Sequence, residues 1–214
     1  LDLRPLHTDE AVHAAKLGIL LDTGVYTYDP REYHGPTLYY FSLPFVALSG
    51  ARSYAEIASA VPLRLAPAFF GTALVLLPLL FLDGLGRRAV LLAGGLAALS
   101  PAFVYYSRYA IQEVLFVFFT WTAVGCAWRY LQRPGVGWAV AVGMAVGLMQ
   151  ATKETSVIAY VCAGAAAGLA VVVAHGLECQ HREPRAAIRL WHVGFATAVA
   201  LVVAVLALSN FLRN

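Results

Sequence analysis

The stretch PLRLAPAFFGTALVLLPLLFL at residues 62–82 contains one charged residue, Arg64. A helix needs about 20 mostly apolar residues to cross the hydrocarbon core of a bilayer, and this stretch is long enough. The rest of the chain has a similar character, with 60% hydrophobic residues, 13% charged residues and a mean hydropathy of +0.70. Soluble domains carry about 25% charged residues. The sequence therefore predicts an all-α, polytopic membrane protein.

The apolar runs outline about six transmembrane helices, at residues 62–82, 88–106, 111–131, 136–152, 155–174 and 190–212. Residues 36–48 are also apolar, but they are only half to two-thirds as long as a crossing helix, so we expect an interfacial helix on the outer surface. The expected organisation is an outward-facing loop and juxtamembrane helix at residues 1–35, the interfacial helix at 36–50, and a transmembrane bundle at 51–214.

Positive charge predicts which turns face the cytoplasm. Arginines gather at alternate turns between the predicted spans, namely Arg87, Arg88, Arg129, Arg133, Arg182, Arg185 and Arg189. Short cytoplasmic loops collect Lys and Arg, so these turns are predicted to lie inside. The intervening turns carry three polar pairs, Asp9-Glu10, Gln112-Glu113 and Lys153-Glu154. We therefore expect one polar site on the extracytoplasmic face of a multi-pass protein of the plasma membrane.

The two ends of the chain predict a fragment of a longer protein. Residue 1 is Leu, and the outward segment has no signal-peptide layout of a basic start followed by an apolar run. We expect a further spanning helix upstream. The net charge of +3 is accounted for by the inner turns. Since no basic stripe or aromatic–basic platform is present, a nucleic-acid partner is not expected.

The first candidate site is the acidic pair Asp9-Glu10, which lies between His7 and His13. One interpretation is structural: Thr8 or Asp9 caps a helix, and acids in its first turn suit the helix dipole. The other is functional, because adjacent carboxylates with histidines supply a general base near neutral pH and ligands for a divalent cation.

Further candidates are cationic or hydrogen-bonding groups on the outer face: His34 before the interfacial helix, Arg64 near the outer end of the first span, and Arg108 and Lys153 at outer turns. Such groups at headgroup depth can hold a lipid phosphate. The alternative is that long basic side chains extend to the membrane surface without a specific ligand. The positive-inside tendency should deplete cations on this face, which favours the functional interpretation.

Two glutamates open predicted spans on the same face, Glu113 and Glu154. A carboxylate at that depth is costly unless it is paired or faces water, and this raises the expectation of a function. An ion pair of Glu154 with Arg108, or of Glu113 with Lys153, is the structural alternative.

Four ordered motifs carry a resemblance to a known family: His7-Thr8-Asp9-Glu10-Ala11-Val12-His13, Tyr33-His34-Gly35-Pro36, Tyr105-Tyr106-Ser107-Arg108-Tyr109 and Ala151-Thr152-Lys153-Glu154. With them the chain resembles membrane glycosyltransferases of the GT-C fold, in the superfamily of protein O-mannosyltransferases and lipid A aminoarabinose transferases. It is most similar to the branch associated with flippase activity in archaeal N-glycosylation. The resemblance runs over nearly the whole chain.

The resemblance implies transfer of a sugar from a polyprenyl-phosphate donor in the bilayer to an acceptor at the outer face, with inversion. By analogy Asp9 is the general base or a metal ligand, and Glu10 is its neighbour in the site. Glu113 takes the place of the acid that the family carries in its second outer loop. The donor phosphate is bound by Lys153, Arg108, His34 and Arg64. A divalent cation, Mg²⁺ or Mn²⁺, held by the acidic pair is optional.

In a second hypothesis the chain catalyses no reaction. It is instead a non-catalytic partner of lipid-linked-sugar flipping, or a transporter, and the same charges bind a lipid headgroup. Transporters place ionisable groups near the middle of the membrane and often contain inverted repeats. Here the ionisable groups lie at outer helix ends and no inverted repeat is visible. The enzyme is the favoured prediction.

Overall fold

The computed structural model describes residues 5–29, 34–51, 54–59 and 61–179, and these ranges form helices. The elements are α1 (Thr8–Thr23), α2 (Thr37–Ser49), α3 (Tyr54–Ile57), α4 (Val61–Leu74), the 3-10 helix η1 (Leu77–Phe81), α5 (Leu82–Leu99), α6 (Pro101–Tyr106), α7 (Glu113–Gln132), α8 (Val136–Thr152) and α9 (Ser156–Cys179). Within the described ranges, the β-type pairing is one isolated bridge between His34 and Lys153. The all-α prediction is confirmed.

Three helical stretches of the described chain are long and apolar enough to cross a membrane: Val61–Leu99, Glu113–Gln132 and Ser156–Val173. The last two match the predicted spans at residues 111–131 and 155–174. The predicted span at 136–152 is α8, a shorter apolar helix, as is α2. The sixth predicted span, at residues 190–212, lies outside the described residues.

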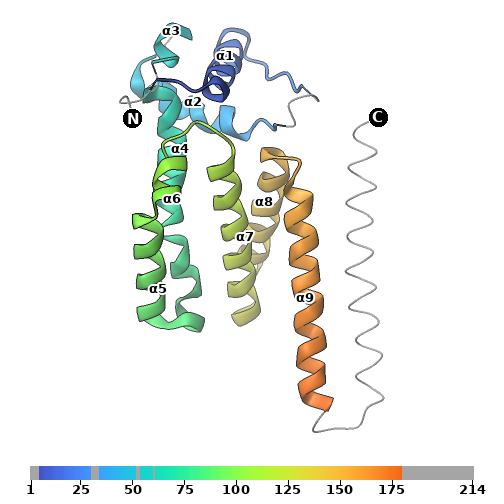
Figure 1. Ribbon diagram of the computed structural model, residues 1–214. Coiled ribbons are helices and arrows are strands. Elements are labelled where there is room, and N and C mark those ends of the chain that lie inside the picture. Colours follow the sequence, from blue (N-terminus) through green and yellow to red (C-terminus); the bar gives the residue numbers. More distant parts are fainter. Residues whose placement is uncertain (1–4, 30–33, 52–53, 60, 180–214) are drawn as a thin grey trace. The chain divides into compact units, whose positions relative to one another are not determined.

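The 39 residues of Val61–Leu99 form two legs. A single helix of that length would measure roughly 58 Å, about twice the thickness of a bilayer core. The chain instead turns at Gly86, whose φ of 77° and ψ of 161° are not helical and are easily reached only by glycine. From this turn α5 runs back alongside η1, and α6 continues alongside α4 (Figure 1). The two legs correspond to the predicted spans at 62–82 and 88–106.

The second of those spans is interrupted, so residues 88–106 belong to two helices. Helix α5 ends at Leu99, and α6 begins at Pro101 after Ser100 in an extended conformation, with ψ of 119°. The residue before a proline is disfavoured in the helical region, so the sequence Ser100-Pro101 accounts for the break.

The chain separates into two compact units, residues 1–154 and residues 155–214. In the first unit, α1, α2 and α3 lie together at one end of the bundle, near the start of α4 and the start of α7 (Figure 1). The start of α5 and the end of α7, which are rich in arginine, lie at the opposite end. In the second unit the described element is α9. The division into segments 1–35, 36–50 and 51–214 stays a prediction.

One apolar cluster attaches α1 to the rest of the first unit. It contains the buried residues Ala14, Leu17, Leu20, Tyr39, Val46, Ile57, Leu63 and Ala110. Complete burial of a leucine-sized side chain contributes about 1.5–3 kcal/mol. Because the cluster reaches α2, α3, α4 and the turn before α7, it fixes α1 against these elements.

Aromatic rings pack α2, α4 and α7 together below this cluster. The ring of Phe70 lies 5.2 Å from Phe41 and 5.1 Å from Phe118, in edge-to-face geometry. Close backbone approach adds to the packing, since a Cβ on Gly71 would lie 2.0 Å from Oγ of Ser107. Glycine at position 71 therefore lets α4 approach the end of α6. The predicted interfacial position of α2 stays a prediction.

Candidate active site

Helix α1 begins at Thr8, and His7 is its N-cap residue. The Asp9 amide donates to Nδ1 of His7 at 3.4 Å, and the His7 amide donates to Oε2 of Glu10 at 3.1 Å. This reciprocal arrangement is a capping box, which satisfies amide groups at the start of a helix. The expectation that Thr8 or Asp9 caps the helix is wrong, because the imidazole of His7 takes that role.

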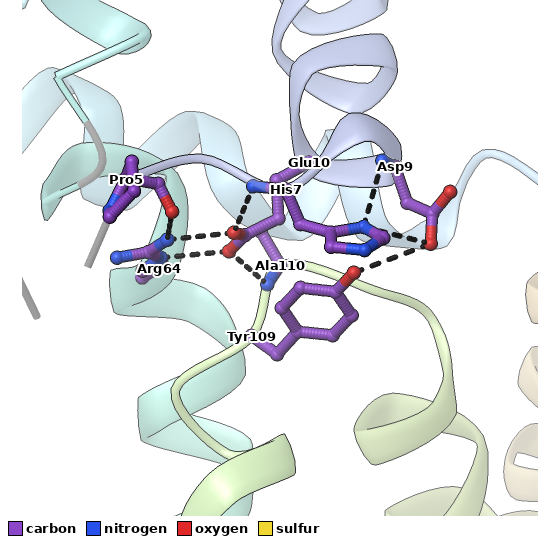
Figure 2. Close-up of polar contacts among 7 residues, drawn as sticks. All are labelled: Pro5, His7, Asp9, Glu10, Arg64, Tyr109 and Ala110. Atoms are coloured by element: carbon purple, nitrogen blue, oxygen red, sulfur yellow. Dashed lines mark hydrogen bonds and ion pairs between the residues drawn. The ribbon is translucent and has the colours of Figure 1, made fainter.

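The two adjacent carboxylates occupy opposite environments. Successive residues of an α-helix are rotated by about 100°, so Asp9 and Glu10 leave the helix in different directions. Figure 2 shows Glu10 turned toward Arg64 and Asp9 turned toward Tyr109. Glu10 is 0% exposed, whereas the side chain of Asp9 is 62% exposed. Only Asp9 is presented to the surface.

Each carboxylate oxygen of Glu10 accepts hydrogen bonds from two donors. Oε1 accepts from Nε of Arg64 at 2.7 Å and from the Ala110 amide at 3.0 Å. Oε2 accepts from Nη2 of Arg64 at 2.7 Å and from the His7 amide at 3.1 Å. Arg64 is 1% exposed, and its Nη2 also donates to the Pro5 carbonyl at 3.2 Å. Glu10 thus joins α1 to α4 and to the turn before α7.

The ionisation of Glu10 follows from these contacts. Burial opposes its charged form, but the hydrogen bonds from Arg64, Ala110 and His7 outweigh burial and hold its pKa below the usual value of 4.5. Hydrogen bonds to a charged group favour that charged form. Glu10 is therefore an anion at neutral pH, already neutralised by Arg64.

The carboxylate of Asp9 has contacts on one oxygen. Its Oδ2 accepts a hydrogen bond from the hydroxyl of Tyr109 at 3.3 Å and lies 3.5 Å from Nδ1 of His7. Among the described residues, Oδ1 has no hydrogen-bond partner, and Figure 2 shows it pointing away from both rings. A carboxylate with one oxygen held and one oxygen open can accept a proton from a ligand hydroxyl.

Tyr109 is 7% exposed and lies between the acidic pair and α7. Its ring meets the ring of His7 edge to face, with centroids 5.6 Å apart. Burial, followed by the charge of Asp9, raises the pKa of Tyr109 to about 12. The phenol is therefore protonated at neutral pH and donates to Asp9.

A second polar cluster lies where the chain before α2 meets the end of α8. Nζ of Lys153 lies 2.7 Å from Oε1 of Glu113, so the ion pair named as the structural alternative for these residues is formed. Lys153 also pairs through its backbone with His34. Glu113 opens α7 only a few residues after Ala110, which contacts Glu10. The segment 108–113 therefore contacts both clusters.

Gly35 explains why the His34-Gly35-Pro36 motif meets Ala151-Thr152-Lys153. The Gly35 amide donates to the Thr152 carbonyl at 3.1 Å. A Cβ on Gly35 would lie 1.8 Å from the Ala151 carbonyl oxygen, a distance that no side chain can accept. The sequence Gly35-Pro36 is typical of a turn. The structure adds a close contact between two backbones, and this contact places His34 beside Lys153.

Arg108 differs from the other predicted phosphate-binding residues. Its side chain is exposed and, within the described ranges, it makes no hydrogen bond or ion pair. The alternative pair of Arg108 with Glu154 is not formed, since Glu154 accepts from the hydroxyl of Tyr28. Arg64, by contrast, is engaged with Glu10.

The acidic pair is not arranged to chelate a metal. Both oxygens of Glu10 are occupied, so a cation would have to displace Arg64 and backbone amides. The described residues contain no group of three or more His, Cys, Asp or Glu side chains that could hold a metal. A Mg²⁺ or Mn²⁺ ion at Asp9 and Glu10 stays a prediction.

Sequence reasoning did not find Tyr109 or the pairing of Glu10 with Arg64. Tyrosine near the end of a predicted span is typical of a membrane-interface belt, so Tyr109 does not stand out in the sequence as a site residue. Arg64 lies 54 positions after Glu10, and no local pattern predicts a pair at that separation. Only the tertiary structure brings them together.

The fold and the site together define a helical membrane protein with a polar cluster at one end of its bundle. The family model for dolichyl-phosphate-mannose-protein mannosyltransferase matches residues 37–212, so the chain belongs to this family. It is thus a membrane glycosyltransferase of a class that uses lipid-linked sugar donors. No curated protein and no solved structure matches the chain.

The matched range begins at Thr37, after Asp9 and Glu10. Arg64, Ala110, Glu113 and Lys153 lie inside it. The acidic pair is therefore connected to the family region by contacts, through Arg64 and Ala110 to Glu10 and through Tyr109 to Asp9.

Proposed function

We propose that this chain transfers a sugar from a polyprenyl-phosphate donor to an acceptor hydroxyl at the outer face of the plasma membrane, with inversion at the anomeric carbon. The observation that carries the proposal is the exposure of Asp9, with one open carboxylate oxygen, beside the buried and neutralised Glu10. A general base must reach the proton that it removes. Asp9 has the required access.

In the proposed step, Oδ1 of Asp9 takes the proton of the acceptor hydroxyl. The acceptor oxygen forms a bond to the anomeric carbon as the bond from that carbon to the phosphate oxygen breaks. Polyprenyl phosphate leaves with the bonding electrons, and Asp9 later releases its proton to solvent. One displacement of this kind inverts the anomeric configuration.

Glu10 has a positioning role in this proposal. Its hydrogen bonds hold the start of α1 against α4 and against the turn that carries Tyr109. Since Asp9 is the next residue along the helix, the same bonds place its carboxylate. Truncating one partner of a buried ion pair is strongly destabilising. Glu10 is therefore required for the geometry of the base, and we assign it no proton transfer.

The donor phosphate is assigned to the cations around segment 108–113. Arg108 is exposed and has no protein partner among the described residues, which suits a ligand that arrives from the membrane. Lys153 would release its ion pair with Glu113 and bind the phosphate instead. The backbone bridge between His34 and Lys153 holds His34 beside it. Cations that face a leaving phosphate stabilise the charge that develops on it. A phosphate contact by Arg64 stays a prediction, because its guanidinium already holds Glu10.

The resemblance to the flippase-associated branch of archaeal N-glycosylation is also part of the proposal. The order of the four motifs supports it.

A panel of radiolabelled polyprenyl-phosphate sugars, offered to membranes that contain the full-length protein, tests the function. Asp9→Asn is compared with wild type, and Asp22→Asn is the matched control, because Asp22 is an exposed acid on the same helix. Loss of transfer in Asp9→Asn alone, at equal expression, supports the proposal. Donor that binds to the wild type but is never transferred would instead support a lipid-handling partner.

A further inference from the structure

The contact between Tyr109 and Asp9 has a geometry suited to more than packing. The phenol hydroxyl donates to Oδ2 of Asp9 at 3.3 Å, and Nδ1 of His7 approaches the same oxygen at 3.5 Å. Figure 2 shows both rings on one side of the carboxylate. The two contacts therefore hold Oδ2 and leave Oδ1 on the opposite side.

Tyr109 is well placed to act as a fixed donor. Its amide donates to the Tyr106 carbonyl at 3.1 Å, and its carbonyl accepts from the Ile111 amide at 2.9 Å. The next residue, Ala110, is bound to Glu10. A side chain that is 7% exposed and fixed on both sides loses little further entropy when it binds a partner.

Asp9 needs such a partner because its own side chain is exposed. An exposed aspartate samples several rotamers, and only some direct a carboxylate oxygen toward a given ligand. Holding a catalytic group in its reactive geometry contributes directly to rate. A neutral phenol can provide this through a hydrogen bond without neutralising the base.

We propose that Tyr109 is a positioning residue for the transfer reaction, whose hydroxyl holds Oδ2 of Asp9 so that Oδ1 faces the acceptor hydroxyl. This inference rests on the proposed function. The raised pKa of Tyr109, about 12, agrees with it, because the phenol keeps its proton over the working range of pH. His7 assists by closing the same side of the carboxylate.

Tyr109→Phe tests the inference, since it removes the hydroxyl and keeps the ring against His7. Tyr106→Phe is the matched control: Tyr106 lies three residues before Tyr109, at the end of α6, and its hydroxyl has no partner among the described residues. The kcat for transfer, the KM for the donor and the thermal unfolding of the purified protein are measured for the full-length protein. We expect kcat to fall about tenfold to a hundredfold, as for loss of a hydrogen bond to a charged group. We expect the donor KM and the unfolding temperature to stay close to wild type.

A merely structural role predicts a different pattern, in which the unfolding temperature falls and kcat per folded molecule is retained. That pattern would overturn the inference, as would a kcat equal to that of Tyr106→Phe. If Tyr109→Phe does not fold, Tyr109→Leu is measured, which keeps a buried apolar side chain and has no hydrogen-bond donor, and the same fall in kcat is expected. Wild-type membranes that transfer no sugar would refute the proposed function and this inference together. Transfer that requires Asp9 but ignores the Tyr109 hydroxyl would refute this inference alone.

Discussion

The buried pair of Glu10 and Arg64 is the most strongly constrained element of the site, and Glu10→Gln perturbs it directly. The amide keeps the size of the side chain and removes its charge. It leaves Arg64, which is 1% exposed, without a counterion. It also replaces one acceptor oxygen by an NH2 group, which then faces hydrogen-bond donors such as those of Arg64. Breaking a buried ion pair in this way costs about 3–5 kcal/mol.

The expected change in unfolding temperature follows from that energy. For a protein of 150–250 residues, 1 kcal/mol shifts the midpoint by about 2–4 °C, so Glu10→Gln should lower it by roughly 6–20 °C. Thermal unfolding in detergent micelles, followed by circular dichroism, measures the shift. Asp22→Asn is the control, because it removes an exposed negative charge from the same helix.

A double variant separates the ion pair from other effects. Glu10→Gln combined with Arg64→Met removes both charges, and we expect the double variant to be more stable than the sum of the single changes, because neither charge is left unpaired. A shift of less than 2 °C in Glu10→Gln, or strictly additive changes in the double variant, would refute the reasoning that the pair fixes the start of α1.

Three further predictions concern other parts of the site. Because the pKa of Glu10 is lowered on folding, its stabilising contribution is present above about pH 4.5 and is lost as pH falls through the folded value; acid unfolding curves should show this loss in wild type and lack it in Glu10→Gln. Gly35→Ala places a Cβ about where the Ala151 carbonyl lies, so we expect loss of transfer and a lower unfolding temperature. The control Gly137→Ala adds a Cβ in open space and should leave both the transfer rate and the unfolding temperature unchanged. Arg108→Ala should raise the donor KM about tenfold to a hundredfold, with little change in unfolding temperature. An equal donor KM in Arg108→Ala and in Arg133→Ala, a control at another exposed arginine, would contradict the assignment of Arg108 to the donor phosphate.

Much of the fold could be predicted because hydropathy is a property of whole segments. The apolar runs around residues 111–131, 136–152 and 155–174 coincide with helices, and the arginines at the start of α5 mark the turn between two legs. The break in the second leg was readable in Ser100-Pro101, where the residue before proline resists the helical region.

The candidate site was less predictable, because its geometry depends on the rotation of one helix. The sequence indicated that Asp9 and Glu10 belong to one site, but not which of them is buried. That outcome depends on His7 as the N-cap and on Arg64, whose contact with Glu10 arises only after α1 packs against α4. The pair of Lys153 with Glu113 was foreseen as one of two structural alternatives, because both lie at helix ends on the same side.

The central claim is that Asp9 is the base of a sugar transfer and that Glu10 supports it from within the protein. The most direct test measures transfer from polyprenyl-phosphate sugar by Asp9→Asn, together with the unfolding temperature of the same preparation. We predict loss of transfer of about 100-fold or more, as expected for a general base, at an unfolding temperature within a few degrees of wild type. Transfer at the wild-type rate by a folded Asp9→Asn protein would contradict the account.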